Sequence, residues 1–246
     1  MAPSKAELNS GGFAVYGGTH GVGLLIAEQL AKTGLAVTIV GRTSPTHGIK
    51  TISNMQIDFS TQSGFIKNRD FLLQNGNIKN FVFNIGGSFG VQEDSPKIDD
   101  FQILTNLNIG YITDTINFLE HSNRLTGSLL VFILSNAVTT GRGNLPYRML
   151  KIALDEYAKA LEVAYTHSFV EILRFYPPLI LYPTRFMAKR FLAIESDSQR
   201  RRFIRDELAG FKPVYPEDLA NEIVLSIIKK LVMTNKNDSL EARLAE

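Results

Sequence analysis

The chain has 246 residues, of which 44% are hydrophobic, and a sequence of this size can bury one sizeable core as a single domain spanning residues 1–246. A formal charge of only +2 gives no reason to expect a nucleic-acid partner, the absence of cysteine excludes disulfides and thiolate chemistry, and the four scattered histidines (His20, His47, His121 and His167) predict no metal site. Because no apolar run is long enough to span a bilayer and residues 1–7 lack a signal-peptide core, we expect a cytoplasmic protein without a membrane partner.

Apolar segments predict strands at residues 13–16, 36–40, 53–57, 80–84, 128–134 and 169–175, with helices between most of them. This alternation favours a parallel sheet that is covered on both faces. A long helix is expected from about Asp99 to His121, and one of its faces carries Phe101, Leu104, Asn108, Ile112 and Ile116. After Ile228 the chain becomes polar without a convincing final strand, so we expect six or seven strands and a polar tail over about 231–246.

A glycine-rich turn, residues 17–23 (GGTHGVG), separates the first strand from a helical pattern that begins at Leu24. Glycine lets the backbone turn tightly and approach a pyrophosphate, and a helix N-terminus offers unpaired N–H groups with a partial positive charge. The spacing is Gly-x-x-x-Gly-x-Gly, which is neither the Gly-x-Gly-x-x-Gly fingerprint nor a P-loop. An ordinary glycine-rich turn between a strand and a helix is the alternative.

Groups suited to proton transfer follow the fifth predicted strand. Ser135 comes directly after the apolar run 129–134, and Tyr147 and Lys151 lie one helical turn apart, with Tyr147 twelve residues after Ser135. A Tyr-x-x-x-Lys pair alone would occur by chance in roughly one such chain in three. Its position matters more, because ligands of open α/β sheets bind at the carboxyl ends of the strands.

Together, the glycine turn and the Tyr147/Lys151 pair resemble the short-chain dehydrogenase/reductase family, over roughly residues 10 to 225. Further matches follow in the family's order: Asp58, Asn84-Ile85-Gly86, Ser135, Pro177 and the segment 216–220. The resemblance implies a three-layer, doubly wound α/β Rossmann fold with a mainly parallel sheet. It also implies a homodimer or homotetramer, built through the helix ending near His121 and the helix that follows Tyr147.

The resemblance implies a nicotinamide cofactor, and the end of the second strand favours NADP(H). An NAD site usually has an Asp or Glu there for the ribose 2′-hydroxyl, whereas this chain has Arg42. One or two charge-assisted hydrogen bonds from Arg42 to a 2′-phosphate, at about 1.5–3 kcal/mol each, would favour NADP(H) roughly ten- to a thousandfold. His20 and Thr43 could add contacts. The alternative is a solvated surface arginine.

The cofactor-binding residues expected in this way are Gly17, Thr19, His20, Gly21, Val22, Gly23, Arg42, Thr43, Asp58, Asn84, Gly86, Tyr147, Lys151, Pro177 and Ile180. Asp58 matches the family position that accepts from the adenine amino group. Otherwise it is a helix N-cap ahead of Thr61.

The implied activity is hydride transfer between NADP(H) and a ketone or secondary alcohol of a small molecule. Tyr147 would act as the general acid/base, Lys151 would supply a cation, and Ser135 would bind the substrate oxygen. Lowering a tyrosine pKa from about 10 by two or three units requires roughly 3–4 kcal/mol of differential stabilisation of the phenolate. Asn108 is expected to support a water that relays protons to Lys151, with Asn106 as an alternative and a helix-bending or interface role as another.

Several residues depart from the family pattern: Tyr16 replaces a Thr, Phe83 replaces an Asn, Asn136 follows Ser135 in place of a small residue, and Pro178 replaces a Gly. These changes reshape the walls of the predicted site but remove no catalytic group. Two other functions also stay open for this sequence. One is a redox-neutral reaction, such as dehydration, epimerisation or isomerisation, and the other is a catalytically silent protein that binds NADP(H) or scaffolds a partner.

A substrate lid is expected over about residues 176–212, and the loop 86–90 is expected to border the same pocket. The lid combines Tyr176, Leu179, Tyr182, Phe186, Met187, Phe191 and Phe203 with Arg185, Lys189, Arg190, Arg200, Arg201, Arg202 and Arg205. Such a lid could favour an apolar substrate with an anionic or polar handle, such as an aromatic polyketide or a terpenoid ketone. The favoured interpretation is an amphipathic helix with solvated arginines and buried aromatics.

Overall fold

The structure is a computed structural model that describes residues 11–45, 51–87, 89, 95–141, 144–182 and 186–244, with backbone alone for Phe186 and residues 235–244. Some expectations fall on residues 1–7, His47, Ser88, Gly90 and Arg185, which lie outside the described residues.

The described residues form one parallel sheet with the strand order β3-β2-β1-β4-β5-β6. Its strands are β1 (Gly12–Tyr16), β2 (Val37–Gly41), β3 (Ile52–Gln56), β4 (Ile78–Phe83), β5 (Leu129–Ile133) and β6 (Glu171–Phe175). The predicted strands are all present, and their ends differ from the predicted ones by at most two residues. The strand order reverses direction between β1 and β4. In open α/β sheets, ligands generally bind at the carboxyl ends of the strands beside such a reversal.

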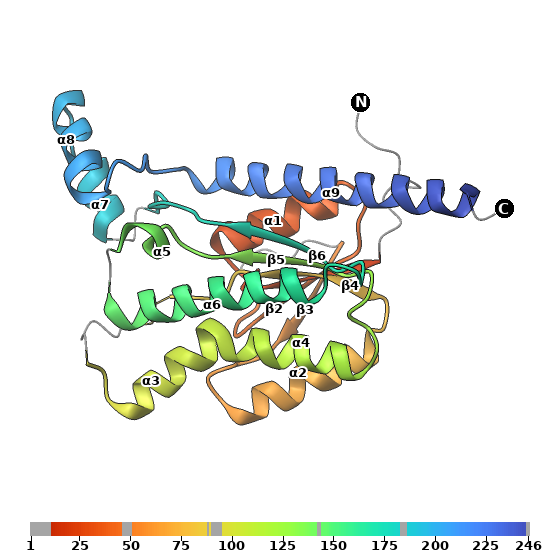
Figure 1. Ribbon diagram of the computed structural model, residues 1–246. Coiled ribbons are helices and arrows are strands. Elements are labelled where there is room, and N and C mark those ends of the chain that lie inside the picture. Colours follow the sequence, from red (N-terminus) through yellow and green to blue (C-terminus); the bar gives the residue numbers. More distant parts are fainter. Residues whose placement is uncertain are drawn as a thin grey trace.

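The helices are α1 (Gly21–Lys32), α2 (Gln62–Gln74), α3 (Ile98–Thr105), η1 (Asn106–Gly110), α4 (Tyr111–His121), α5 (Ala137–Thr140), α6 (Leu145–Ala164), α7 (Phe186–Leu192), α8 (Asp197–Glu207) and α9 (Pro216–Leu244). Figure 1 shows α1 and α9 along one face of the sheet, α2, α4 and α6 on the other, and α7 with α8 at one end. The three layers and the all-parallel sheet confirm the predicted Rossmann-type α/β fold.

Alternation along the strands gives the sheet two apolar faces, each with its own core. Val15 packs in a cluster with Ile26 of α1 and Ile223 of α9. The next residue, Tyr16, points to the opposite face and packs in a cluster that includes Leu119 of α4 and Leu154 of α6. The cores fix the helices against the sheet, so the loops at the strand ends start from a rigid frame.

Tyr16 and Phe83, two of the departures from the family pattern, belong to the core rather than to the wall of the predicted site. Both side chains are fully buried, and their ring centroids lie 5.5 Å apart. The Tyr16 hydroxyl donates to Asn68 Oδ1 at 2.9 Å, and Asn68 in turn donates to Thr115 Oγ1 at 2.9 Å. These hydrogen bonds satisfy a buried phenol that would otherwise destabilise the core.

The described part of the chain contains no seventh strand. Instead, α9 continues to Leu244, through most of the segment that was expected to be a polar tail. Leu231 is buried in the core beside α1, and Lys230 forms an ion pair with Glu171 of β6 at 2.7 Å. Apolar residues at helical spacing along the inner face of α9, as far as Leu231, pack in this core.

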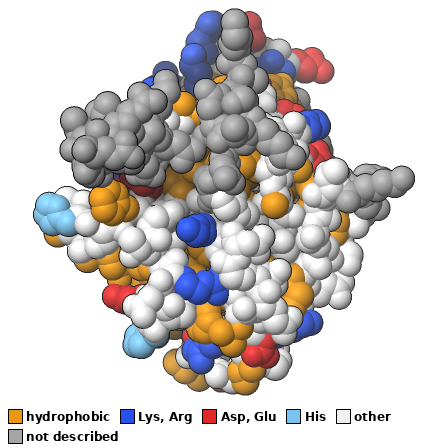
Figure 2. Space-filling view, turned by 90° about the vertical axis from the view of Figure 1, so that its right-hand side faces the viewer, with side chains coloured by type: hydrophobic (Ala, Val, Ile, Leu, Met, Phe, Trp, Pro, Cys, Tyr) orange, Lys and Arg blue, Asp and Glu red, His pale blue; other side chains and the backbone are white. Residues whose placement is uncertain are grey.

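Figure 2 shows the end of the molecule opposite α7 and α8, where basic, acidic, neutral and hydrophobic side chains are interspersed. Across the described part of this face the charges do not gather into one large patch of a single sign. None of the helices in the described ranges combines the length and apolar character needed to cross a membrane.

Candidate active site and cofactor site

The glycine turn lies at the carboxyl end of β1, where α1 begins, as predicted. Gly17 has φ +77°, and a Cβ atom added there would lie 2.9 Å from the backbone N of Ile85. At Gly23 an added Cβ would lie only 2.2 Å from the carbonyl O of Gly17. The turn therefore requires glycine at both positions, for its left-handed backbone in one case and for close packing in the other.

The turn is also fixed from the neighbouring strand. Asn84, directly after β4, donates from Nδ2 to the carbonyl O of Gly17 at 3.2 Å. Among the described residues, no protein group accepts a hydrogen bond from the backbone N–H of Val22 or Gly23, in the first turn of α1. Such N–H groups, together with the positive end of the helix dipole, form an anion-binding position.

Thr19, His20 and Thr43 connect the glycine turn to the end of β2. Thr19 Oγ1 lies 3.0 Å from His20 Nδ1, and Thr43 Oγ1 donates to Thr19 Oγ1 at 3.4 Å. Thr19 is buried against Gly41, where an added Cβ would lie 2.8 Å from Thr19 Cγ2. Arg42 directly follows Gly41 and is exposed. Its long cationic side chain therefore begins beside the glycine turn.

Asp58 lies after β3, at the same edge of the sheet, but it does not cap α2. Its Oδ1 accepts from the backbone N of Ser60 at 3.0 Å and from Ser60 Oγ at 2.7 Å. The N-cap is Thr61, whose Oγ1 accepts from Gly64 N at 3.3 Å. The N-cap alternative for Asp58 is therefore wrong, because the loop turns locally before the helix begins.

Lys151 occupies the centre of the site and is 2% exposed. Its Nζ donates to the carbonyl O of Ile133, in β5, at 3.0 Å, and lies 5.9 Å from the centre of the Tyr147 ring. A Cβ atom added at Gly86 would lie 2.7 Å from this nitrogen, so a larger residue there would displace the ammonium group. Burial lowers the pKa of Lys151 to about 8. The ammonium form thus predominates at neutral pH, but by a smaller margin than for an exposed lysine.

Tyr147 lies in the first turn of α6, which begins slightly before the predicted position. Asn144 is the N-cap, its Oδ1 accepts from the backbone N of Tyr147 at 3.2 Å, and Pro146 occupies the first turn. Both residue types are favoured at helix starts. This local sequence fixes where α6 begins, and therefore places the Tyr147 side chain at the carboxyl end of β5, beside Lys151.

Ser135 follows β5, and its Oγ accepts from the backbone N of Ala137 at 3.2 Å. The next residue, Asn136, donates its backbone N–H to the carbonyl O of Pro177 at 3.0 Å. Pro177 is buried, and Ile180 forms an isolated parallel bridge with Val214. The segment after β6 is thereby joined to the end of β5 on one side and to the start of α9 on the other.

Asn108 is fully buried in η1, a turn of π-helix that interrupts the long helix between α3 and α4. Its Oδ1 accepts from Gly87 N at 3.0 Å, and its Nδ2 donates to Gly87 O at 3.0 Å and to Leu104 O at 2.9 Å. The side chain therefore clamps the loop after β4 against Lys151. Single π-helical turns within α-helices often occur at functional sites.

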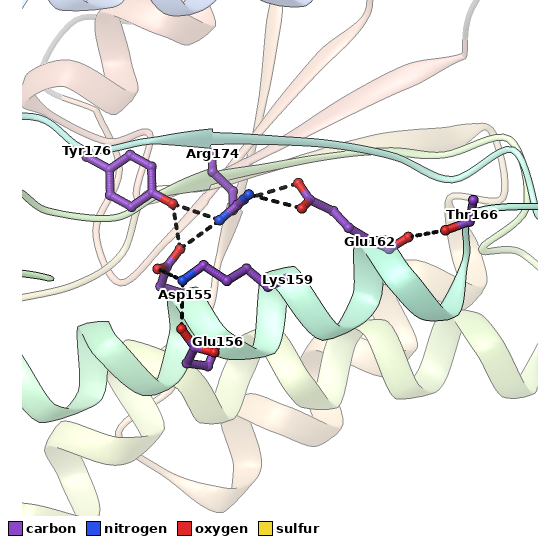
Figure 3. A network of polar contacts seen from close by, with 7 residues as sticks. All are labelled: Asp155, Glu156, Lys159, Glu162, Thr166, Arg174 and Tyr176. Atoms are coloured by element: carbon purple, nitrogen blue, oxygen red, sulfur yellow. Dashed lines mark hydrogen bonds and ion pairs between the residues drawn. The ribbon is translucent and has the colours of Figure 1, made fainter. Parts of the chain in front are cut away.

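A polar network that the sequence analysis missed joins α6 to β6 (Figure 3). Arg174 donates to Asp155 Oδ1 at 3.1 Å and to Glu162 Oε2 at 3.0 Å, and Tyr176 donates to Asp155 Oδ1 at 2.6 Å. Lys159 adds an ion pair to Asp155 at 2.8 Å. Burial alone would raise the pKa of Asp155, but hydrogen bonds from Lys159, Tyr176 and Arg174 lower it. The one hint of this network in the sequence is an acidic residue, Asp155, one helical turn beyond Lys151.

The predicted lid contains a short helical hairpin, α7 and α8, at the end of the sheet (Figure 1). Phe191 and Phe203 pack with ring centroids 5.9 Å apart. The guanidinium groups of Arg190 and Arg200 lie over these rings, at 5.3 Å from Phe203 and 5.9 Å from Phe191 respectively. This packing agrees with an amphipathic hairpin, since these two arginines pack against its own aromatic side chains.

Tyr182 was counted only among the lid aromatics, yet the structure places its hydroxyl directly on the glycine turn. A Cβ atom added at Gly21 would lie 2.7 Å from Tyr182 Oη, and this oxygen is buried. Tyr182 lies 161 positions after Gly21, and no local pattern relates the two. Otherwise the glycine turn and the N–H groups at the start of α1 fit the diphosphate of a dinucleotide.

Comparison of the sequence with family models finds no match, and neither does comparison with curated proteins. Solved structures match over most of the chain. A short-chain dehydrogenase/reductase from Caenorhabditis elegans, solved with cofactor, is 20% identical with a TM-score of 0.70, and the match covers 92% of this chain and 91% of that one. L-Sorbose reductase from Gluconobacter frateurii, complexed with NADPH and L-sorbose, is 19% identical with a TM-score of 0.68, covering 91% and 90%.

A short-chain dehydrogenase family protein from Francisella tularensis subsp. tularensis is 18% identical with a TM-score of 0.67, covering 87% of this chain and 89% of that one. These likenesses extend over most of each chain, although the sequences are only 18–20% identical. The protein therefore has the fold of the short-chain dehydrogenases/reductases, as the sequence predicted.

Proposed function

We propose that the protein is an NADP(H)-dependent oxidoreductase of the short-chain dehydrogenase/reductase family, which interconverts a ketone and a secondary alcohol of a small molecule. The observation that carries this proposal is the position of Lys151. Its buried ammonium nitrogen lies between Gly86 and the carbonyl O of Ile133, beside Tyr147. A lysine is buried at a high cost in free energy, and proton-transfer chemistry gives a reason for that burial.

In this proposal Tyr147 donates a proton to the substrate carbonyl oxygen in reduction and accepts it from the alcohol in oxidation. Lys151 stabilises the phenolate through its charge, which is present below about pH 8 because burial lowers its pKa to about 8. Ser135 donates its hydroxyl hydrogen to the substrate oxygen. NADPH supplies the hydride when it is bound. Asn108 fixes the loop at Gly87 that borders Lys151, and its predicted link to a proton-relay water is part of the proposal.

The cofactor-binding residues are assigned by the same reasoning. The first turn of α1 would bind the diphosphate through the N–H groups of Val22 and Gly23. Arg42 would bind the 2′-phosphate with support from Thr43 and His20, which hydrogen bonds already connect to the turn through Thr19. Asp58 would accept from the adenine, while Pro177 and Ile180 would border the nicotinamide.

The substrate is proposed to be a small molecule, as it is for L-sorbose reductase among the similar structures. Self-association through the α3–α4 helix and α6 is proposed with it, from the family resemblance. Met149 and Ile152 of α6 and Ile103 of α3 are large apolar side chains exposed on these helices, which supports an interface there.

The test is a fluorescence titration of cofactor-free protein with NADPH and with NADH, repeated for Arg42→Ala. We expect NADPH to bind at least about tenfold more tightly than NADH, and the preference to be lost in the variant. Arg201→Ala is the control, because Arg201 is an exposed arginine on α8 rather than at the end of β2. If neither nucleotide binds to the wild-type protein, the proposal fails, whereas equal binding of both would remove only the NADP(H) preference.

A further inference from the structure

We propose that Tyr182 is an internal cap on the dinucleotide site, and that its phenol must leave the glycine turn before the diphosphate of the cofactor can bind. This inference rests on the proposed function and adds a control of cofactor entry to it. The starting point is the contact at Gly21, whose left-handed backbone (φ +63°) turns the chain into α1. The phenol oxygen lies 2.7 Å from the place where a Cβ of residue 21 would be.

The second step is that the capped position is the one where an anion would bind. Gly21 is the first residue of α1, and the N–H groups of Val22 and Gly23 follow it without a protein acceptor among the described residues. An anion bound there would approach the backbone at hydrogen-bonding distance. A phenol that touches Gly21 takes up part of that space, so the ring and a diphosphate exclude each other.

The third step is that hydrogen bonds anchor the backbone next to Tyr182. The backbone N–H of Leu181 donates to Val214 O at 2.9 Å, and Val214 N donates to Leu179 O at 3.0 Å. Residues 179–181 are therefore fixed to the chain that precedes α9. Rotation about the Tyr182 side-chain torsions can then move the ring away from Gly21 while these hydrogen bonds persist.

The fourth step concerns the strength of the cap. The Tyr182 ring is half-buried and packs against the core formed by β1, α1 and α9. Contacts of this kind favour the capped arrangement, so only a fraction of the molecules would be ready for the cofactor at any moment. The apparent affinity for the cofactor falls by that fraction, and a substitution that removes the ring restores it.

The experiment measures NADPH affinity and binding kinetics for the wild-type protein, Tyr182→Ala, Tyr182→Phe and the control Tyr215→Ala. Tyr215 is an exposed tyrosine in the segment before α9. We expect Tyr182→Ala to bind NADPH at least about tenfold more tightly. Tyr182→Phe keeps the ring but loses the oxygen nearest to Gly21, so its affinity should lie between those of the wild type and Tyr182→Ala, while Tyr215→Ala stays within about threefold of the wild type. Observed binding rates should reach a plateau with NADPH concentration in the wild type, and the plateau should rise or vanish in Tyr182→Ala.

Unchanged or weaker binding by Tyr182→Ala would overturn the cap. If both Tyr182→Ala and Tyr182→Phe bind NADPH more weakly than the wild type, the phenol hydroxyl binds the phosphate of the cofactor and does not exclude it. Tyr182→Thr repeats the test with a smaller polar side chain in case the alanine variant folds poorly, which circular dichroism would reveal.

A second measurement separates this inference from the proposed function. Hydrogen exchange of the backbone amides of residues 17–24 is measured without any nucleotide, in the wild type and in Tyr182→Ala. Faster exchange in the variant supports the cap even if no variant binds NADPH, in which case the proposed function alone fails. Unchanged exchange, at equal global stability, would contradict the cap whether or not the cofactor binds.

Discussion

The buried ammonium group of Lys151 connects the stability of the protein with its proposed chemistry. The side chain is 2% exposed and its Nζ donates to the carbonyl O of Ile133, and desolvation lowers its pKa from 10.5 to about 8. In the unfolded chain the pKa is near 10.4. The folded state therefore loses its proton first as the pH rises, and the cost of burying the charge is present in full only below about pH 8.

We expect Lys151→Met to be more stable than the wild type at pH 7, by about 1–3 kcal/mol, because the burial cost of the charge disappears. Between pH 8 and 10.5 the unfolded chain binds more protons than the folded one, so the wild type gains stability with pH and the difference narrows. Urea unfolding at several pH values measures this. Lys159→Met is the control, since Lys159 is exposed and no narrowing is expected there. A difference that stays constant from pH 7 to 10 would contradict the prediction.

Tyr147 is the residue on which the proposed proton transfer depends most directly. We expect Tyr147→Phe to keep its affinity for NADPH, because the ring and its packing near Lys151 remain, and to lose at least about a hundredfold in kcat. The measurement combines a fluorescence titration with steady-state kinetics on a carbonyl substrate found by screening. An unchanged kcat would remove Tyr147 from the mechanism, and a parallel loss of NADPH affinity would indicate a structural role.

Helix α6 is held by a cap at its start and by ion pairs to β6 further along. Near its start, the Asn144 cap and Pro146 fix the first turn, which carries Tyr147. Further along, Asp155 and Glu162 bind Arg174 of β6, so the helix that supplies Tyr147 and Lys151 is attached to the strand that leads to Pro177 (Figure 3). The predicted site thus depends on two elements that are linked by an ionic network centred on the buried carboxylate of Asp155.

We expect Arg174→Ala to lower the free energy of unfolding by about 1–3 kcal/mol, because it removes a partner from the buried Asp155 carboxylate. Lys159 and Tyr176 still bind Asp155 and limit the loss. Thermal or urea unfolding gives the value. The matched control is Arg205→Ala, whose ion pair with Asp206 is exposed, and a change within about 0.5 kcal/mol is expected there. Equal effects of the two substitutions would show that the network contributes little.

At the scale of the whole molecule, the main departure from expectation lies beyond β6. The sheet of the described residues ends at β6, within the predicted six or seven strands, and the segment that was expected to be a polar tail extends α9 to Leu244. The ion pair between Lys230 and Glu171 attaches this helix to the edge strand. Apolar side chains in the first part of α9, as far as Leu231, pack on the sheet and hold the helix from which the polar segment continues.

The sequence by itself determined the strands, the glycine turn and the placement of Ser135, Tyr147 and Lys151 at strand and helix ends. These features follow from patterns within a few residues, such as apolar periodicity, glycine spacing and helix caps, and local physical chemistry fixes them. The prediction was wrong for Tyr16 and Phe83, which were assigned to the walls of the site although both lie in the core. A single strand does not show which face of the sheet has room for an additional aromatic ring.

Only the tertiary structure decided the rest. The contact of Tyr182 with Gly21, the network of Arg174 with Asp155, and the Asn108 clamp on Gly87 all join residues that are far apart in the sequence. Each depends on the distance and orientation of two elements after both have packed on the sheet, and no local pattern specifies these quantities. Local sequence therefore determined which groups stand at the ends of the strands, whereas packing determined which of them touch.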